Sequence, residues 1–187
     1  RIVRSTPQQP GGGRHRDALI DNAERAISDG SHNFALAARL LDTDTRDGMM
    51  LLYAWCRRCD DIIADKHHAR PLDHAVNDLK DTEDRIQAIR VLTRRALAEQ
   101  PTADPAFDGF GLLANEYRLT GDMANDVIAG LALDAAEWRP RTEADLMRYC
   151  YHAAGAVAVM AARIMGVPAD DGETLDRACD MGITIEL

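Results

Sequence analysis

Apolar residues recur every three or four positions along most of this chain, which is the spacing of one buried helix face. In the clearest example, within residues 47–66, the stripe includes Leu51, Trp55 and Ile62. No stretch of any length alternates apolar and polar residues as a half-buried strand would. The pattern therefore predicts an all-α protein, with helices over residues 17–28, 34–41, 47–66, 81–100, 106–118, 124–133, 142–165 and 171–187.

The two ends of the chain differ from the helical part between them. Residues 1–15 are polar and rich in Pro and Gly, so we expect this segment to be disordered. The last predicted helix reaches Leu187 without a capping Gly, Asn or basic residue, which indicates a chain cut inside a helix. We expect residues 16–187 to form the N-terminal part of a single domain that is incomplete at its C-terminus.

Composition narrows the function classes. Hydrophobic residues make up 46% of the 187 residues and aromatic residues only 5%, which favours helices over sheets. The net charge of −9 argues against nucleic acid as a partner. An anionic substrate stays open, because arginines and a divalent cation can reverse the sign of the charge at one site. No apolar run is long enough to cross a membrane, so we expect a cytoplasmic protein.

Two of the four cysteines, Cys56 and Cys59, form a C-x-x-C pair. Such a pair can be redox-active or can supply half of a zinc site. There is no second C-x-x-C and no βαβ pattern nearby, so we interpret the pair as small residues on a buried helix.

The segment YAWCRRCDDIIAD, residues 53–65, is the strongest chemical signal in the chain. It places Asp60, Asp61 and Asp65 shortly after Arg57 in an otherwise apolar helix. Buried carboxylates need a partner, and Mg²⁺ is often held by carboxylates together with the phosphates of a substrate. The segment suggests a diphosphate–metal site. Ordinary ion pairs between residues three and four apart explain the same spacing, and the spacing alone does not separate the two hypotheses.

Two more features stay open on their residues alone. Asp134 follows the apolar run GLAL and is either a second acidic site residue or simply the residue at a helix end. Tyr149 and Tyr151 precede a run of small residues, residues 153–158, which would let another helix or a bulky apolar ligand come close.

Taken together, the motifs resemble the squalene/phytoene synthase family, and most closely its bacterial phytoene synthases. The resemblance covers about residues 20–187. The segments that carry it are YAWCRRCDDIIAD, SHNFALAARLL (31–41), GLALD (130–134), RYCYHAAGAVAVMAARIMGV (148–167) and LDRACDMGITIEL (175–187). It implies an isoprenoid (terpenoid) synthase-type helical bundle around a central cavity.

The resemblance also implies an activity, that of a 15-cis-phytoene synthase type of prenyltransferase. Such an enzyme condenses two geranylgeranyl diphosphates head to head into phytoene, through a cyclopropyl (prephytoene) diphosphate, in carotenoid biosynthesis. It would use Mg²⁺, with Mn²⁺ as the alternative ion. The partners implied are geranylgeranyl diphosphate, other enzymes of the carotenoid pathway, and a membrane surface contacted peripherally because the product is apolar.

Site residues follow by position from the matching motifs. The resemblance implies a metal group (Asp60, Asp61 and Asp65), a substrate-binding group (Ser31, Tyr53, Arg57 and Asp134) and a catalytic group (Asp60, Asp61 and Tyr151).

The sequence departs from the family pattern at several positions. The family's D-x-x-x-D motif would place its second carboxylate at Ala64, whereas Asp65 lies roughly 100° further around the helix. Ala158 replaces a Gly and Glu186 replaces a Gln. The second aspartate-rich motif would begin after Leu187, so we expect the 187-residue chain alone to be inactive. Two alternatives remain: a squalene or dehydrosqualene synthase that uses farnesyl diphosphate, and a non-catalytic helical binding protein of the same fold.

Overall fold

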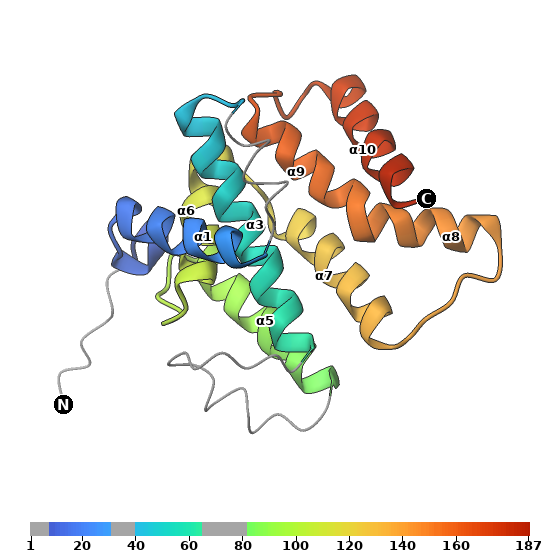
Figure 1. The fold of residues 1–187 in the computed structure, drawn as a ribbon, viewed down its shortest axis with the longest axis horizontal. Coiled ribbons are helices and arrows are strands. Elements are labelled where there is room, and N and C mark those ends of the chain that lie inside the picture. The colour runs from blue at the N-terminus through green and yellow to red at the C-terminus, as the bar shows by residue number, and fades with distance from the viewer. Residues whose placement is uncertain (1–7, 31–39, 65–81) are drawn as a thin grey trace.

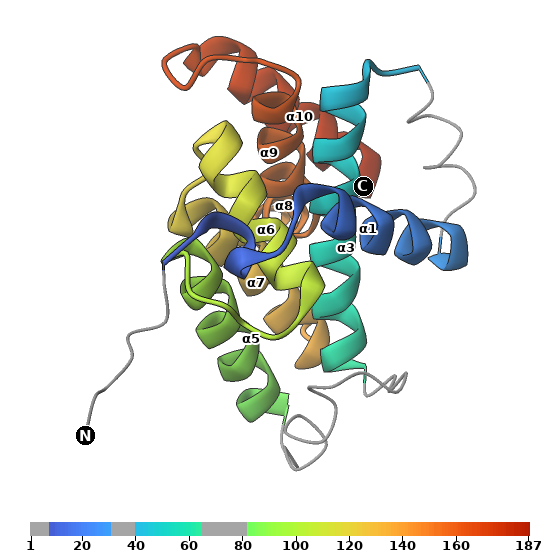
Figure 2. The same ribbon diagram turned by 90° about the vertical axis from the view of Figure 1, so that its left-hand side faces the viewer.

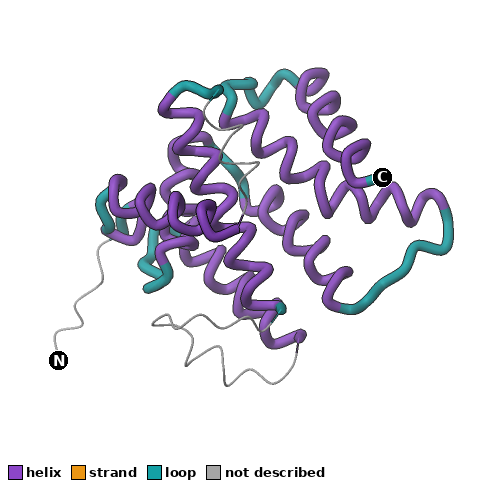
Figure 3. Tube along the Cα trace, viewed as in Figure 1, coloured by secondary structure: helices purple, strands orange, loops and turns teal. Residues whose placement is uncertain are grey.

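The computed structural model describes residues 8–30, 40–64 and 82–187. All regular structure in these ranges is helical, as Figure 3 shows, which confirms the predicted all-α class. The elements are η1 (Pro10–Gly13), α1 (Arg16–Gly30), α3 (Thr43–Ile63), α5 (Thr82–Leu97), α6 (Pro105–Tyr117), α7 (Gly121–Ala135), α8 (Glu143–Cys150), η2 (Tyr151–Gly155), α9 (Ala156–Ile164) and α10 (Gly172–Glu186). Among the described helices, none is both long and apolar enough to cross a membrane.

Most helices lie where the apolar spacing predicts them, and the differences are at their ends. Helix α3 starts at Thr43 instead of residue 47, because the Asp42 side chain caps it by accepting a hydrogen bond from the Thr45 amide. Its first turn is polar, so no apolar residue marks it in the sequence. The helix predicted over residues 34–41 falls mostly outside the described residues.

Part of the segment predicted to be disordered, residues 8–15, is described by the structure. Pro10–Gly13 forms a short 3-10 turn, η1, against α6. Gly11 is buried there with a φ of 72°, a conformation that glycine adopts without strain. The Arg14 guanidinium then pairs with the buried Asp108 carboxylate at 2.9 Å. Tertiary contacts hold a segment whose composition alone suggests disorder.

Helix α3 runs through the centre of the bundle, with α1 crossing it and α5 and α6 beside it (Figure 1). Trp55 of α3 is fully buried, stacks on Phe110 of α6 at 4.1 Å between ring centroids, and donates its indole N–H to the Thr93 hydroxyl of α5. These contacts join three helices at one side chain, which fixes the orientation of α3.

A second group of helices packs through small residues. In Figure 1, α8, η2 and α9 form one long run, with α7 and α10 beside it, and Figure 2 shows α9 and α10 together from another side. A Cβ atom on Gly130 of α7 would lie 2.8 Å from the His152 carbonyl, and one on Gly182 of α10 would lie 2.8 Å from the Ala154 carbonyl oxygen. The small residues of this region therefore permit close helix packing. The central cavity of the expected fold stays a prediction.

Candidate functional site

The last turns of α3 carry the acidic motif on two different faces. Tyr53, Arg57 and Asp61 are spaced four residues apart and share one face of the helix. Asp61 is half-buried, and its Oδ1 lies 3.4 Å from Arg57 Nε. Asp60 is exposed and points about 100° away from Asp61. The ion pair expected from spacing is therefore present, and it leaves the two adjacent carboxylates pointing in different directions.

Asp61 supplies the test of whether this face fits a metal ion. Its Oδ1 atom is buried and makes no hydrogen bond within the described part of the chain, although the Arg57 guanidinium lies 3.4 Å away as an ion-pair partner. The Arg57 charge offsets part of the cost of burying this oxygen, and a carboxylate oxygen is the type of ligand that a divalent cation takes. Within the ranges described, no group of three His, Cys, Asp or Glu side chains could hold a metal alone. The residues thus fit a cation that shares its coordination with further oxygen atoms.

The two adjacent arginines of the motif have different environments. The Arg58 Nε donates a hydrogen bond of 2.7 Å to Asp104 Oδ2, and the two side chains are only 4% and 2% exposed. Asp104 also caps α6 by accepting from the Ala106 amide. Arg57 is 39% exposed. Arg58 therefore links α3 to α6, and only Arg57 is accessible to a ligand.

The C-x-x-C pair lies in the interior as small packing residues. Cys59 is buried, Cys56 is half-buried, and both are free thiols. Burial, with the nearby Asp60 carboxylate, raises the pKa of Cys56 to about 12 and raises the pKa of Cys59 well above its usual range. Both thiols stay protonated at neutral pH, which favours the packing interpretation over a redox role.

A second acidic stripe lies on α7 and faces the tyrosines of the α8–η2 run. Asp126, Gly130 and Asp134 are four residues apart and share one face. The Tyr149 hydroxyl donates to Asp134 Oδ1 at 2.7 Å, and the Tyr151 hydroxyl donates to Asp126 Oδ2 at 2.7 Å. The sequence predicted Asp134 and Tyr151 as site residues but missed the partner of each. The regular spacing of Asp126, Gly130 and Asp134 is the signal that could have revealed the stripe.

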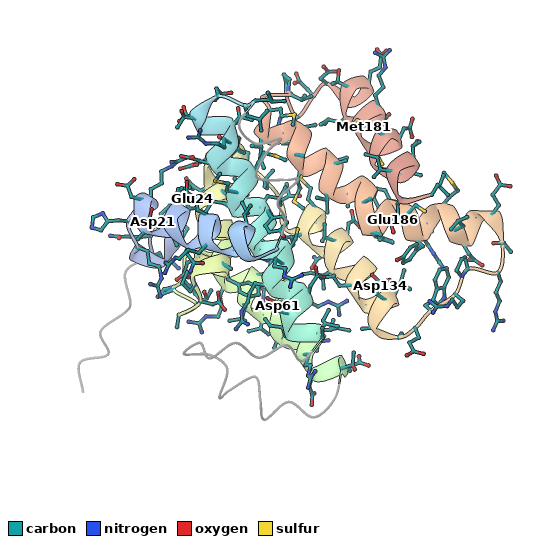
Figure 4. All side chains as sticks on the ribbon, in the orientation of Figure 1. Asp21, Glu24, Asp61, Asp134, Met181 and Glu186 are labelled. Atoms are coloured by element: carbon teal, nitrogen blue, oxygen red, sulfur yellow. The ribbon has the colours of Figure 1, made fainter. Side chains whose placement is uncertain are left out.

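Both phenols are held protonated by these bonds. The hydrogen bond to Asp134 is the main cause that raises the pKa of Tyr149 to about 12, and burial and the charges of Asp134 and Glu186 add to it. The bond to Asp126, followed by burial, raises the pKa of Tyr151 to about 12. Figure 4 labels Asp61, Asp134 and Glu186, which come from α3, α7 and α10.

The helix bearing the tyrosines is not regular. The segment predicted as one helix over residues 142–165 contains a π turn, η2, at Tyr151–Gly155. The Ala156 amide bonds to the Tyr151 carbonyl, five residues back instead of four. Such turns are often found at functional sites. The predicted site residues Ser31 and Asp65 fall outside the described residues.

A sequence model of the squalene/phytoene synthase family matches residues 27–187. This chain is a member of the squalene/phytoene synthase family.

Curated members of the family include relatives with closely similar sequences. A phytoene synthase of Pseudescherichia vulneris is 41% identical over 169 residues, which cover 90% of this chain and 53% of the relative. A 15-cis-phytoene synthase of Pantoea ananas is 38% identical over 170 residues, covering 91% of this chain and 54% of the relative. The chain spans about half the length of these relatives.

Solved structures of the family confirm the fold. Squalene synthase HpnC from Alicyclobacillus acidocaldarius superposes with a TM-score of 0.76 at 19% identity, over 95% of this chain and 63% of that one. A dehydrosqualene synthase crystallised with a ligand superposes with a TM-score of 0.72 at 21% identity, over 91% of this chain and 55% of that one. The structure therefore has the helical fold of squalene and dehydrosqualene synthases.

The departure at Ala64 from the family pattern has a clear structural setting. Ala64 is the exposed residue that caps α3, and its amide bonds to the Asp60 carbonyl at 2.8 Å. A carboxylate at this position would lie one turn beyond Asp60 on the same side of the helix. The position expected to carry the family's second carboxylate is therefore the C-cap of α3, where this chain has a methyl group.

Proposed function

We propose that this chain is part of a 15-cis-phytoene synthase. The observation that carries the proposal is identity of 38% and 41%, over about 90% of the chain, to relatives that are themselves named phytoene synthases. The reaction proposed is the head-to-head condensation of two geranylgeranyl diphosphates into phytoene through prephytoene diphosphate.

The α3 face would bind the diphosphate end of the substrate. Arg57 and Tyr53 lie one turn apart on that face, and Arg57 is exposed enough to move from Asp61 to a phosphate oxygen. Asp61 would hold a divalent cation, with Asp60 and Asp65 as the other proposed ligands. Bound there, Mg²⁺ or Mn²⁺ would supply positive charge that favours departure of the diphosphate.

The acidic stripe of α7 would act on the hydrocarbon part of the substrate, at the carbon atoms where positive charge develops when the diphosphate leaves. The Asp134 carboxylate accepts a hydrogen bond from the Tyr149 hydroxyl, and the Asp126 carboxylate accepts one from the Tyr151 hydroxyl. Each hydrogen bond holds the phenol in one orientation and increases the electron density on its oxygen. Fixed groups of this kind stabilise a nearby cation without having to reorganise. We therefore propose that Tyr149 also belongs to the reacting centre, in addition to Tyr151 and Asp134.

The test is an assay of the full open reading frame that carries this sequence. The purified product would be incubated with Mg²⁺ and either geranylgeranyl or farnesyl diphosphate, and the extracted hydrocarbons identified by mass spectrometry. An Asp61→Asn variant serves as the control for metal and diphosphate binding. Phytoene formed from geranylgeranyl diphosphate, and lost in this variant, is the expected result.

Other outcomes would replace the proposal. Squalene or dehydrosqualene formed from farnesyl diphosphate would assign the chain to that branch of the family. Metal-dependent binding of a non-hydrolysable prenyl diphosphate, without any hydrocarbon product, would indicate a binding protein that has kept the fold. Contact with a membrane surface or with other carotenoid-pathway enzymes is a separate proposal, which co-sedimentation of the same product with vesicles or with those enzymes would test.

A further inference from the structure

Asp126 of α7 forms hydrogen bonds with the side chains of two consecutive residues of the π turn, Tyr151 and His152. Its Oδ2 accepts the Tyr151 hydroxyl at 2.7 Å, and its backbone carbonyl lies 3.0 Å from Nδ1 of His152. Because a carbonyl oxygen can only accept, this contact places the proton of His152 on Nδ1. The Asp126 Oδ1 atom lies 3.7 Å from the same nitrogen. One residue of α7 thus holds the first two residues of the turn.

The turn itself determines where the tyrosines point. A π turn adds one residue to a helical turn. It therefore rotates the side chains of the preceding helix about the helix axis relative to those of the following helix. Here α8, which carries Tyr149, precedes the turn, and α9 follows it. Holding the turn at Tyr151 and His152 therefore sets the direction of the α8 side chains relative to α9.

The backbone packing shows that this arrangement is tight. Gly130, one turn after Asp126, leaves no room for a Cβ atom against the His152 carbonyl. On the other side of the turn, a Cβ atom on Gly155 would lie 3.0 Å from the Cys179 sulfur of α10. The π turn is enclosed between α7 and α10, and Asp126 supplies its side-chain anchor on the α7 side.

We propose that Asp126 is a positioning residue of the prenyl-transfer reaction, which holds the π turn and directs the Tyr151 hydroxyl at the reacting centre. This inference rests on the proposed function. The raised pKa of Tyr151 agrees with it, because the phenol stays a proton donor to Asp126 at neutral pH. The alternative is that Asp126 only stabilises the packing of α7 against η2 and does not affect the reaction. The experiment must distinguish these two roles.

The experiment compares Asp126→Asn, Tyr151→Phe and the double variant in the full open reading frame product. Asp122→Asn is the matched control, because Asp122 is an exposed residue on the same helix that undergoes the same chemical change. The measurements are kcat, KM for geranylgeranyl diphosphate, the ratio of prephytoene diphosphate to phytoene, and the thermal unfolding midpoint.

We expect Asp126→Asn to lower kcat about tenfold or more, with KM nearly unchanged, and to raise the proportion of prephytoene diphosphate. In the Tyr151→Phe background the same change should have little further effect, since the two residues act as a unit. The Asp122→Asn control should behave as the wild type. A product ratio in Asp126→Asn equal to that of the control, or additive effects of the two changes, would overturn the inference.

Failure of the proposed function gives a different result. A wild type that makes no phytoene from geranylgeranyl diphosphate overturns that function, and the inference with it. A wild type that makes phytoene, with an unchanged product ratio in Asp126→Asn, overturns the inference alone. If Asp126→Asn does not fold, Asp126→Glu decides the matter, because it keeps the carboxylate acceptor but displaces it by one methylene from the Tyr151 hydroxyl: a changed product ratio supports the inference and an unchanged one refutes it.

Discussion

Arg57 and Arg58 are adjacent in α3, but they have different roles. Arg57 pairs with Asp61 on a partly exposed face, and Arg58 forms a buried pair with Asp104. An exposed ion pair contributes little to stability, whereas removing one member of a buried pair leaves an uncompensated charge in the interior. Substitution of Arg58 should therefore lower the stability of the fold much more than substitution of Arg57.

Arg58→Ala is expected to lower the free energy of unfolding by about 3–5 kcal/mol, because Asp104 would remain buried and charged. Arg57→Ala, the matched control, should cost less than about 1 kcal/mol while weakening the binding of a prenyl diphosphate analogue. Urea unfolding followed by circular dichroism measures the first effect and calorimetric titration the second. Equal losses of stability in the two variants would contradict this assignment.

Ala64 gives a second prediction at the residue scale. Ala64→Asp should raise the affinity for Mg²⁺ by about tenfold or more when a non-hydrolysable prenyl diphosphate is bound, because it adds an oxygen ligand one turn beyond Asp60. Ala98→Asp is the control, since Ala98 is exposed and likewise follows the end of a helix. Calorimetric titration of Mg²⁺ into each variant is the measurement. An unchanged affinity in Ala64→Asp would show that this position does not face the cation.

At the scale of elements, α7 and η2 can approach closely because Gly130 has no side chain. The backbone of His152 occupies the space that a Cβ atom on Gly130 would need. A methyl group there must push two helices apart, and overpacking of this kind typically costs about 1–3 kcal/mol. Because Asp126 and Asp134 lie one turn to either side of Gly130, the same displacement would lengthen both tyrosine–carboxylate bonds.

Gly130→Ala is accordingly expected to lower the free energy of unfolding by about 1–3 kcal/mol. Gly172→Ala, at the start of α10, has no atom within 4 Å of the added Cβ and should change stability by no more than about 1 kcal/mol. Denaturant unfolding of both variants makes the comparison. A Gly130→Ala protein as stable as Gly172→Ala would show that α7 and η2 can separate without cost.

At the scale of the whole molecule, most of the buried apolar residues that the structure describes form a single cluster. It extends from α1 through α3, α5, α6 and α7 to α9, with Trp55 fully buried near its centre. No boundary divides this cluster among the described residues. The prediction that residues 16–187 belong to one domain therefore leads to an expectation about unfolding: the chain should lose its structure in one cooperative step.

Urea unfolding of a Trp138→Phe variant tests this expectation, because its fluorescence then reports Trp55 alone. The midpoint from fluorescence should coincide with that from far-ultraviolet circular dichroism, which reports all helices, including α8 and α10. Separate midpoints would show that the α8–α10 region unfolds independently of the core around Trp55.

The sequence by itself determined the helical class, the position of most helices and the family. Apolar periodicity is a local property, since residues four apart meet on one helix face whatever lies opposite them. The same local spacing predicted that Arg57 and Asp61 meet on one face, and the family resemblance marked Tyr53, Asp134 and Tyr151 as candidates. Composition does not contain the contacts that Pro10–Gly13 and Arg14 make with α6, because these contacts depend on the position of a distant helix.

Tertiary structure alone decided which polar groups of different helices meet. Nothing in the spacing of the chain pairs Tyr151 with Asp126 or Tyr149 with Asp134, because these partners belong to different helices whose separation depends on Gly130. The π turn was likewise invisible, since it changes the hydrogen bonding of the backbone and leaves the apolar pattern almost unaltered. Side-chain partners between helices follow from packing, which is the property that local sequence patterns do not contain.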